Sequence, residues 1–228
     1  MRLFSYCIPV DDGAAPNPFG GICTLAICKP VIRRVADVGC WVVGTGSSNV
    51  NGIDYSGKII YAMRVSEKVT MEKYDQLCLT KYPFKIPKWS SNIRSEKLGD
   101  SVYDFQKKIN GKPSVRPSVH TKENRDHDLG GENVLISDFF YYFGKEAIEI
   151  PDEYRIIARQ GQGHQSNKNE EVKEKFIQWL TTSNFKSNDL VGYPQLFDEH
   201  LPENGKCSCG SYRAGESVCD EFYSGIVL

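Results

Sequence analysis

Hydrophobic and polar positions along the chain predict a strand-rich N-terminal half. Apolar stretches rich in β-branched and aromatic residues cover 2–10, 22–28, 38–44 and 58–66, and Gly, Pro, Asn and Ser separate them. The loop between the third and fourth stretches, 45–57, consists largely of Gly, Ser and Asn. Two strands joined by such a loop indicate a long hairpin, so we expect these two strands to be neighbours in one sheet.

Helices are predicted where apolar residues recur at every third or fourth position. Thr70 can cap a helix that begins over 70–75. The clearest helix covers 169–180, because its apolar residues fall on one face: Val172, Phe176, Trp179 and Leu180. The other expected elements are a short turn of helix or strand at 31–35, a strand at 155–159 and a tight loop at 161–164.

The stretch 133–144 combines a buried strand with a run of aromatic residues. Residues 134–136 are continuously apolar, and five aromatic side chains follow at 139–143. Successive side chains of a strand point to opposite faces of a sheet, so five aromatics in a row cannot all enter one core. Either one face lines a pocket for stacked bases, or the sheet has a core on each side. We predict the pocket, with Tyr141 or Tyr142 facing it.

The composition is that of an ordinary globular chain, but the charge is unevenly distributed. The 228 residues are 40% hydrophobic and 25% charged, with a formal net charge of −1. Residues 81–125 contain eleven Lys or Arg and four Asp or Glu, a net charge of +7, so the rest of the chain carries −8. This segment is polar and weakly periodic, and we predict an irregular basic insert. It is either an anion-binding face or a solvated loop.

The length of the apolar runs and the cysteine content bear on the compartment. No apolar run approaches the length of a membrane span or of a signal peptide, so we expect a cytoplasmic protein without a membrane partner. The eight cysteines are then expected to be free thiols. Cys207, Cys209 and Cys219 should not bind zinc, because a single residue separates the first two. We expect neither a metal nor a cofactor.

Two loops have the composition of ligand-binding loops. The first precedes a strand and contains Asn17, Phe19, Gly20 and Gly21. Its glycines allow close approach of a ligand to the backbone and its phenylalanine offers a stacking face, but the same residues also suit a turn chosen only for its shape. The second follows the strand at 38–44 and contains Thr45, Gly46 and Ser47. It lacks the Gly-Lys-Ser/Thr ending of a Walker phosphate loop, although it leaves room for a base or a backbone phosphate.

The candidates for acid–base chemistry are His164 in the loop at 161–164, Asp138, and a polar cluster from His120 to Asp128. A neutral histidine can act as an acid, as a base or as a hydrogen-bond donor to a phosphate, whereas a lone histidine is more often structural. The cluster at 120–128 could hold a metal, but its spacing matches no zinc-protease or zinc-deaminase pattern. No serine or cysteine has an identifiable base partner in the sequence.

Several of these motifs together resemble the nucleotide modification associated domain 2 family. They are Asn17-Pro18-Phe19-Gly20-Gly21, Lys29-Pro30, the stretch 38–46, Tyr61-Ala62-Met63-Arg64-Val65 and the string 134–144. Gly163-His164 and the helix with Trp179 fit the C-terminal part of the family, and the resemblance extends over residues 2–180. Members are associated, through the genes around them, with phage and bacterial systems that modify DNA bases. The resemblance implies a nucleic-acid context and no particular reaction.

A weaker likeness is to PUA-like domains, including the EVE and YTH types that bind modified bases. Val38-Gly39-Cys40-Trp41 and Val65-Ser66-Glu67 stand where such domains begin a buried strand and end the next one, although Cys40 replaces their acidic residue. We therefore expect an α+β fold, either a small PUA-like β-barrel or a strongly curved mixed sheet, with flanking helices and a basic irregular insert. The modification-associated domain is expected at 1–190, with an irregular acidic extension at 191–228.

We predict a protein that recognises a nucleotide or a modified base, with DNA as the expected partner. It would act within a DNA-modification or antiphage system whose other proteins are potential partners. The residues expected to hold the ligand are Asn17, Phe19, Gly20, Gly21, Trp41, Thr45, Gly46, Ser47, Arg64, Ser137, Asp138, Tyr141, Tyr142 and His164. Phosphates would be met by Lys81, Lys85, Lys88 and Arg94.

Two alternatives remain open at this point. One is an enzyme acting on a nucleotide or base through His164, Asp138 or His120, and the other is a structural subunit of a modification complex. An enzyme needs titrating groups within reach of one another as well as a pocket. The question for the structure is therefore whether Asp138, His164 and the aromatic residues line one cavity.

Overall fold

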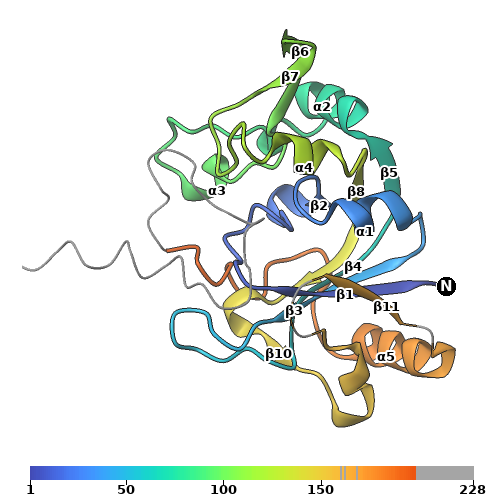
Figure 1. Ribbon diagram of the computed structural model, residues 1–228. Coiled ribbons are helices and arrows are strands. Elements are labelled where there is room, and N and C mark those ends of the chain that lie inside the picture. The colour runs from blue at the N-terminus through green and yellow to red at the C-terminus, as the bar shows by residue number, and fades with distance from the viewer. Residues whose placement is uncertain (160, 162, 168, 199–228) are drawn as a thin grey trace, which may run out of the picture.

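The computed structural model describes residues 1–159, 161, 163–167 and 169–198 (Figure 1). Its largest sheet has the strand order β10-β4-β3-β1-β11, and β9 pairs with β4 beside β10. β1 and β3 run parallel, whereas the other pairs in this sheet are antiparallel. The strands are β1 (Leu3–Ile8), β3 (Trp41–Gly46), β4 (Lys58–Arg64), β9 (Phe139–Tyr142), β10 (Ile148–Glu149) and β11 (His164–Asn167).

Two smaller sheets complete the strand structure of the part of the chain that is described. The first is antiparallel and has the order β2-β8-β5, formed by β2 (Cys23–Leu25), β8 (Asn133–Ser137) and β5 (Glu67–Thr70). The second is a hairpin of β6 (Tyr103–Ile109) and β7 (Lys112–Val115). Only Asp138 separates β8 from β9, so one extended stretch of chain belongs first to the three-stranded sheet and then to the large one.

The described residues form five α-helices around these sheets: α1 (Pro30–Val35), α2 (Met71–Thr80), α3 (Arg94–Lys97), α4 (Arg125–Leu129) and α5 (Glu170–Thr182). Short 3-10 turns occur at Phe19–Gly21, Pro83–Lys85, Gly144–Glu146 and Asp152–Ile157. The predicted cap of α2 is present, since the Thr70 hydroxyl accepts a hydrogen bond from the Lys73 amide at 3.2 Å. Asn169 caps α5 in the same way, accepting from the Val172 amide at 3.1 Å.

Three hydrophobic cores hold the layers together. The central core lies between the large sheet and the three-stranded sheet and includes Tyr6, Val42, Met63 and Leu135. A second core joins the other face of the large sheet to α5, which lies below that sheet in Figure 1, and includes Trp41, Val43, Phe176 and Leu180. The third core packs α2 and the segment 98–119 on the three-stranded sheet and includes Tyr74, Cys78, Leu98 and Val134.

The mixed α+β class is confirmed, but the described residues form no closed barrel, because β11 and the β9–β10 side remain open edges of the large sheet. The basic insert at 81–125 is not irregular, since it contains α3, both strands of the hairpin and the start of α4. The strand predicted at 155–159 is instead largely a 3-10 turn, and the expected loop at 161–164 leads directly into β11. None of the described helices has the length and apolar character needed to cross a bilayer.

Tyr141 and Tyr142, one of which was predicted to face an aromatic pocket, are both buried. Phe140 and Tyr142 enter the central core, whereas Tyr141 and Phe143 enter the core beneath α5. Each of these four side chains is at most 2% exposed, and the Tyr142 hydroxyl donates to the buried carboxyl of Asp11. The alternative of a core on each face of the sheet is therefore correct, and the strand alternation is satisfied without an open stacking surface.

Candidate active site

Cys28 lies where the chain leaves β2 and turns into α1. Its backbone is left-handed with a φ of +58°, and that of Lys29 is left-handed with a φ of +40°. Such backbone is unfavourable for residues other than glycine and occurs often at functional sites. Pro30 then begins α1, where its missing amide hydrogen is not needed. The Cys28 amide donates to Asp128 Oδ1 at 2.7 Å, and this hydrogen bond fixes the turn.

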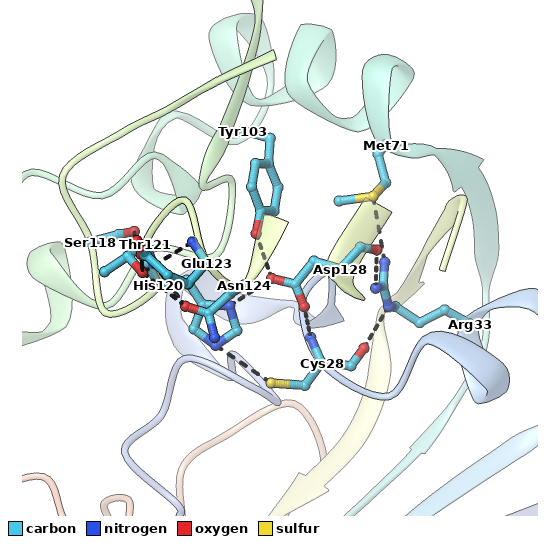
Figure 2. Close-up of polar contacts among 10 residues, drawn as sticks. All are labelled: Cys28, Arg33, Met71, Tyr103, Ser118, His120, Thr121, Glu123, Asn124 and Asp128. Carbon is cyan, nitrogen blue, oxygen red and sulfur yellow. Dashed lines mark hydrogen bonds and ion pairs between the residues drawn. The ribbon is translucent and has the colours of Figure 1, made fainter. Parts of the chain in front are cut away.

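The Cys28 thiol is the first member of a line of three groups. Its Sγ atom lies 3.6 Å from Nε2 of His120, and Nδ1 of the same imidazole lies 2.6 Å from Oδ2 of Asp128 (Figure 2). The three residues are 6%, 3% and 0% exposed, respectively. A thiol, an imidazole and a carboxylate in this order are the arrangement by which cysteine-dependent enzymes activate a nucleophile.

The protonation of this line follows from its electrostatics. Burial alone would raise the pKa of Asp128, but the hydrogen bond and charge of His120, the Tyr103 hydroxyl and the Cys28 amide together hold it below the usual value. An ionised Asp128 accepts the Nδ1 hydrogen of His120, which leaves Nε2 as the acceptor facing the thiol. Tyr103 stays protonated, because burial and the neighbouring carboxylate raise its pKa, and it donates to Oδ2 of Asp128 at 2.6 Å.

Local structure positions each of the three groups. The Ser118 hydroxyl donates to the His120 carbonyl at 3.0 Å, and the Thr121 amide donates to Oδ1 of Asn124 at 2.9 Å just before α4 begins. His120 therefore sits on a hydrogen-bonded turn, and Asp128 is the fourth residue of α4. His120 and Asp128 are eight residues apart in the sequence. They form a direct hydrogen bond because the turn that carries His120 folds back onto α4.

Arg33 braces the site from α1. Its guanidinium is fully buried and donates to three backbone carbonyls: Cys28 at 2.7 Å, Asn133 at 2.9 Å, and Asp128. Five N–H groups in a planar fork allow one arginine to serve several acceptors at once. The arginine thus joins the thiol-bearing turn to the helix that carries the carboxylate.

The same three residues are also a candidate metal site. Among the described residues, Cys28, His120 and Asp128 form the one group of His, Cys, Asp or Glu whose possible ligand atoms all lie within 4.8 Å of one another. His120 already uses Nδ1 for Asp128, so an ion bound at Nε2 would have Cys28 as its other protein ligand and Asp128 as the support of the imidazole. A closed structural zinc site takes four protein ligands, which this set does not provide. The donor set fits a thiol–imidazole pair better than a metal centre.

The first predicted ligand loop has a structural role. Asn17 is 1% exposed, donates through Nδ2 to the Leu98 carbonyl at 2.8 Å and accepts from Lys85 Nζ at 2.6 Å through Oδ1. Phe19 lies 5.9 Å from the ring of Phe197, and Gly21 is exposed. Gly20 has a φ of +80°, and a Cβ atom there would lie 2.1 Å from the Phe84 ring. The loop is thus shaped to pack against the insert.

The residues predicted around the large sheet are mostly structural as well. Trp41 is buried with its ring 5.9 Å from Phe139, and the Thr45 hydroxyl donates to the Arg159 carbonyl at 3.0 Å. Gly46 allows close approach of Tyr55, whose Cβ would lie 2.4 Å from an added Cβ. The Ser47 hydroxyl donates to the Asn49 carbonyl at 3.2 Å. None of these four contacts involves the thiol, the imidazole or the carboxylate of the candidate site.

Asp138 and His164 do not share a cavity. Asp138 follows β8, accepts from the Ser66 hydroxyl, and lies in a shallow surface hollow together with Arg64. Arg64 is exposed with its guanidinium 5.3 Å from the Phe139 ring, and Ser137 is buried and donates to the Arg64 carbonyl at 2.7 Å. His164 begins β11, which β4, β3 and β1 separate from β9. The two predicted titrating groups therefore lie towards opposite edges of the large sheet.

The four predicted phosphate contacts have different environments. Lys81 and Lys88 are exposed, and Lys88 pairs with Glu96 at 3.5 Å. Arg94 is partly buried and donates to the Leu196 carbonyl at 3.1 Å. Lys85 is fully buried and donates to the carbonyls of Asn17 and Ile22 at 2.9 and 3.1 Å. Burial lowers the pKa of Lys85 to about 8, and its place in the core removes it from the set of phosphate contacts.

Sequence reasoning found His120 and the cluster around it but missed Cys28, Arg33 and Tyr103. A signal for Cys28 is present in Ile27-Cys28-Lys29-Pro30, where an apolar stretch ends just before a proline that can open a helix. The five cysteines in the described residues are all free and buried, and Cys28 alone among them contacts a histidine in the hydrogen bonds given above. Cys207, Cys209 and Cys219 lie outside the described residues.

Comparison with known proteins gives one match. The sequence model for nucleotide modification associated domain 2 matches residues 1–200. No curated protein and no solved structure matches the chain. The matched region includes every element described above, from β1 to α5, together with the thiol, the imidazole and the carboxylate of the candidate site. The chain belongs to the nucleotide modification associated domain 2 family.

Proposed function

We propose that the protein is a cysteine-dependent enzyme of a nucleotide-modification system, with Cys28 as the nucleophile, His120 as the general base and acid, and Asp128 as the group that orients the imidazole. One observation carries the proposal: the thiol lies 3.6 Å from Nε2 of an imidazole whose Nδ1 lies 2.6 Å from a buried carboxylate. A cysteine with a purely structural role needs no contact with a histidine. A histidine with such a role does not need the left-handed backbone that Cys28 and Lys29 adopt beside it.

The chemistry is transfer or hydrolysis of an acyl-type group carried by a nucleotide or its base. In the first step His120 Nε2 takes the thiol proton, the sulfur forms a bond to the electrophilic carbon, and the bond from that carbon to the leaving group breaks. The leaving group departs with the proton from His120. In the second step His120 removes a proton from water or an amine, which forms a bond to the same carbon. The bond between that carbon and the sulfur breaks, and the sulfur takes the proton from His120 to regenerate the thiol.

The family supports the substrate class, because its name associates the domain with nucleotide modification. The positions of the other groups support the roles. Asp128 is ionised and accepts three hydrogen bonds, from the Cys28 amide, the Tyr103 hydroxyl and His120, so it can stabilise a charged imidazolium as the thiol loses its proton. This enzyme proposal replaces His164 and Asp138 with His120 as the group for acid–base chemistry.

Alkylation of the native protein tests the proposal. Because the thiolate is the reactive form of cysteine, we expect iodoacetamide to label Cys28 about tenfold faster than an unactivated thiol of the same accessibility. Cys40 is the matched control, since it is also 6% exposed and its Sγ contacts the Asp37 amide rather than a histidine. Peptide mass spectrometry over a time course gives both rates in one sample.

Substitution of the histidine completes the test. In His120→Gln the labelling rate of Cys28 should fall to that of Cys40, while circular dichroism and the rate at Cys40 stay unchanged. Equal rates at the two cysteines in the unsubstituted protein, or a Cys28 rate that does not respond to the substitution, would show that the thiol and the imidazole form a purely structural contact.

Nucleic-acid binding by the basic insert is a second candidate function, which one observation favours. The tip of the β6–β7 hairpin projects from the molecule in Figure 1, and it carries the exposed residues Lys107, Lys108, Ile109 and Lys112. Three lysines around one exposed apolar side chain suit a phosphate backbone and its grooves. The hairpin would then deliver a polynucleotide, whereas the enzymatic step would take place at Cys28.

A further inference from the structure

Lys29, the residue that follows Cys28, belongs to a group of three basic side chains near β1 that also includes Arg159 and His164. Lys29 Nζ lies 4.7 Å from the centroid of the Tyr6 ring, and Tyr6 is the register partner of His164 on the neighbouring edge strand. The His164 ring lies 6.1 Å from the ring of Phe4. Lys29 and His164 therefore lie over the same aromatic patch of β1, and both are partly exposed.

Arg159 reaches the same place from the opposite side of β1. Its backbone is fixed by Thr45, whose hydroxyl accepts from the Arg159 amide at 3.3 Å and donates to the Arg159 carbonyl at 3.0 Å. Its guanidinium points towards Gly163, where a Cβ atom would lie 4.0 Å from Nη2. Arg159 therefore extends alongside the residue that precedes His164.

These three side chains share one electrostatic environment. Burial, and then the positive charges of Arg159 and Lys29, lower the pKa of His164. The same two charges act on Cys7, where they lower a thiol pKa that burial raises. Among the residues that the structure describes, no carboxylate forms an ion pair with Lys29. Lys29 and Arg159 therefore place positive charge close to the histidine, and a bound anion would be attracted to both.

The group is next to the proposed nucleophile. Lys29 follows Cys28 directly, and both residues are in the left-handed conformation that turns the chain from β2 into α1. The Cys28 thiol also lies close enough to Tyr6 to contribute to the raised pKa of that hydroxyl, for which burial is the main cause. Tyr6 thus contacts Lys29 directly and interacts electrostatically with the thiol.

We propose that Lys29, Arg159 and His164 form the phosphate-binding site of this enzyme and hold the phosphate of a nucleotide substrate next to Cys28. The inference rests on the proposed function for the identity of the reacting group, but phosphate binding does not require Cys28 to react. Lysine and arginine supply charge and hydrogen-bond donors to phosphate oxygens, and the histidine supplies a further donor. This assignment gives His164 a binding role and leaves the proton transfers to His120.

Calorimetric titration of the full-length protein tests the site with four probes: inorganic phosphate, a deoxynucleoside 5′-monophosphate, the parent deoxynucleoside, and a short single-stranded oligonucleotide. We expect the monophosphate to bind and the nucleoside to bind at least about tenfold more weakly, because a charge-assisted hydrogen bond contributes about a factor of ten or more. Binding of the monophosphate indicates a free nucleotide as the phosphate source. Binding of the oligonucleotide alone indicates a polynucleotide and leaves the site assignment intact.

Substitutions locate the binding. Lys29→Met and His164→Asn should each weaken binding of the monophosphate, or of the oligonucleotide if that is the ligand, by about tenfold. Lys29→Arg keeps the charge and should restore most of the affinity. Lys73→Met removes an exposed lysine on α2 and should leave the affinity unchanged. Failure of every phosphate-containing probe to bind, or equal binding by the Lys29→Met and Lys73→Met proteins, would overturn the assignment.

A Cys28→Ser variant separates this inference from the proposed function. The variant should bind the phosphate probes as the unsubstituted protein does, because the serine leaves the charged group in place. Phosphate binding together with an unreactive Cys28 would support the phosphate-binding site and contradict the proposal of a cysteine-dependent enzyme. A reactive Cys28 without phosphate binding would support the proposal of a cysteine-dependent enzyme and contradict the phosphate-binding site.

Discussion

Asp11 is a carboxyl group that the fold keeps partly protonated near neutral pH. It is 1% exposed, and it accepts hydrogen bonds from the Tyr142 hydroxyl and, at 3.1 Å, from the Gln195 amide. Burial raises its pKa to about 7, although these two hydrogen bonds lower it in part. The charge state of this single residue is therefore linked to the pairing of the chain near 195 with the loop that follows β1.

This raised pKa makes stability depend on pH in a defined direction. The unfolded carboxyl has a pKa of about 3.9, so between about pH 4 and 7 the folded state binds the extra proton. Stability should then fall as pH rises through this window, by at most about 1.4 kcal/mol per pH unit from this residue. Asp11→Asn cannot ionise, so its unfolding free energy should fall less steeply across the window.

Urea unfolding at four pH values between 4.5 and 7.5 measures this slope. The comparison is the difference between the unsubstituted and substituted proteins, since other buried carboxyls titrate in both. Glu174→Gln, on the exposed side of α5, should give a curve parallel to that of the unsubstituted protein. A parallel curve for Asp11→Asn as well would contradict the raised pKa.

At the scale of elements, Arg33 connects three of them through backbone carbonyls. It extends from α1 and donates to Cys28 after β2, to Asp128 on α4 and to Asn133 on β8. Arg33→Lys should destabilise the protein by about 3 kcal/mol or more, because one ammonium group cannot reach all three buried acceptors and unsatisfied buried carbonyls cost about 1–3 kcal/mol each.

The neighbouring arginine provides the control. Arg34 is exposed and donates to the Gly130 carbonyl, so Arg34→Lys should change stability by less than about 1 kcal/mol. Guanidinium-induced unfolding at pH 7 compares the two variants through their midpoints. Equal shifts for both would mean that the three hydrogen bonds of Arg33 contribute no more than a surface contact.

The elements that sequence reasoning located are those with a strong local signal. The strands that became β1, β3 and β4 are long apolar stretches, and α2 begins at the predicted Thr70 cap. β11 was missed because His164 and the residues after it are polar, and they become a strand only by pairing with β1 across the length of the chain. The hairpin in the insert was missed for a similar reason, since its outer residues are mostly lysine and glutamine rather than β-branched.

At the scale of the whole molecule, the candidate site could be predicted only in part. His120 and Asp128 are eight residues apart, so they appear in the sequence as one polar cluster. Cys28 is 92 residues from His120, and only the packing of α4 against α1 brings the two together. The aromatic run misled the prediction because strand alternation is compatible with either a pocket or two cores, and tertiary structure decides between them.

Salt dependence tests whether the projecting hairpin binds nucleic acid. If three lysines at the tip each meet a phosphate of a single strand, the slope of log affinity against log salt should include a contribution of roughly −2. Replacing Lys107, Lys108 and Lys112 by glutamate should weaken binding and flatten the slope by about that amount. Fluorescence anisotropy with a labelled single-stranded oligonucleotide at several salt concentrations measures both quantities.

The control variant changes the net charge by the same amount but at positions outside the hairpin. Replacing Lys73, Lys175 and Lys186 by glutamate removes three exposed lysines that lie outside the hairpin, on α2, on α5 and after α5. This variant should keep most of the salt slope. If both triple variants flatten the slope alike, net charge rather than the hairpin determines the binding.

The extended stretch 133–142 belongs to two sheets in succession, and this has a mechanical consequence. A strand that continues from one sheet into the next ties the two together without a flexible linker. We therefore expect no hinge motion that would separate the two sheets on either side of the central core. If Cys28 is the nucleophile that we propose, we expect a substrate to reach it by displacement of the loops around the thiol, with the two sheets as a fixed frame.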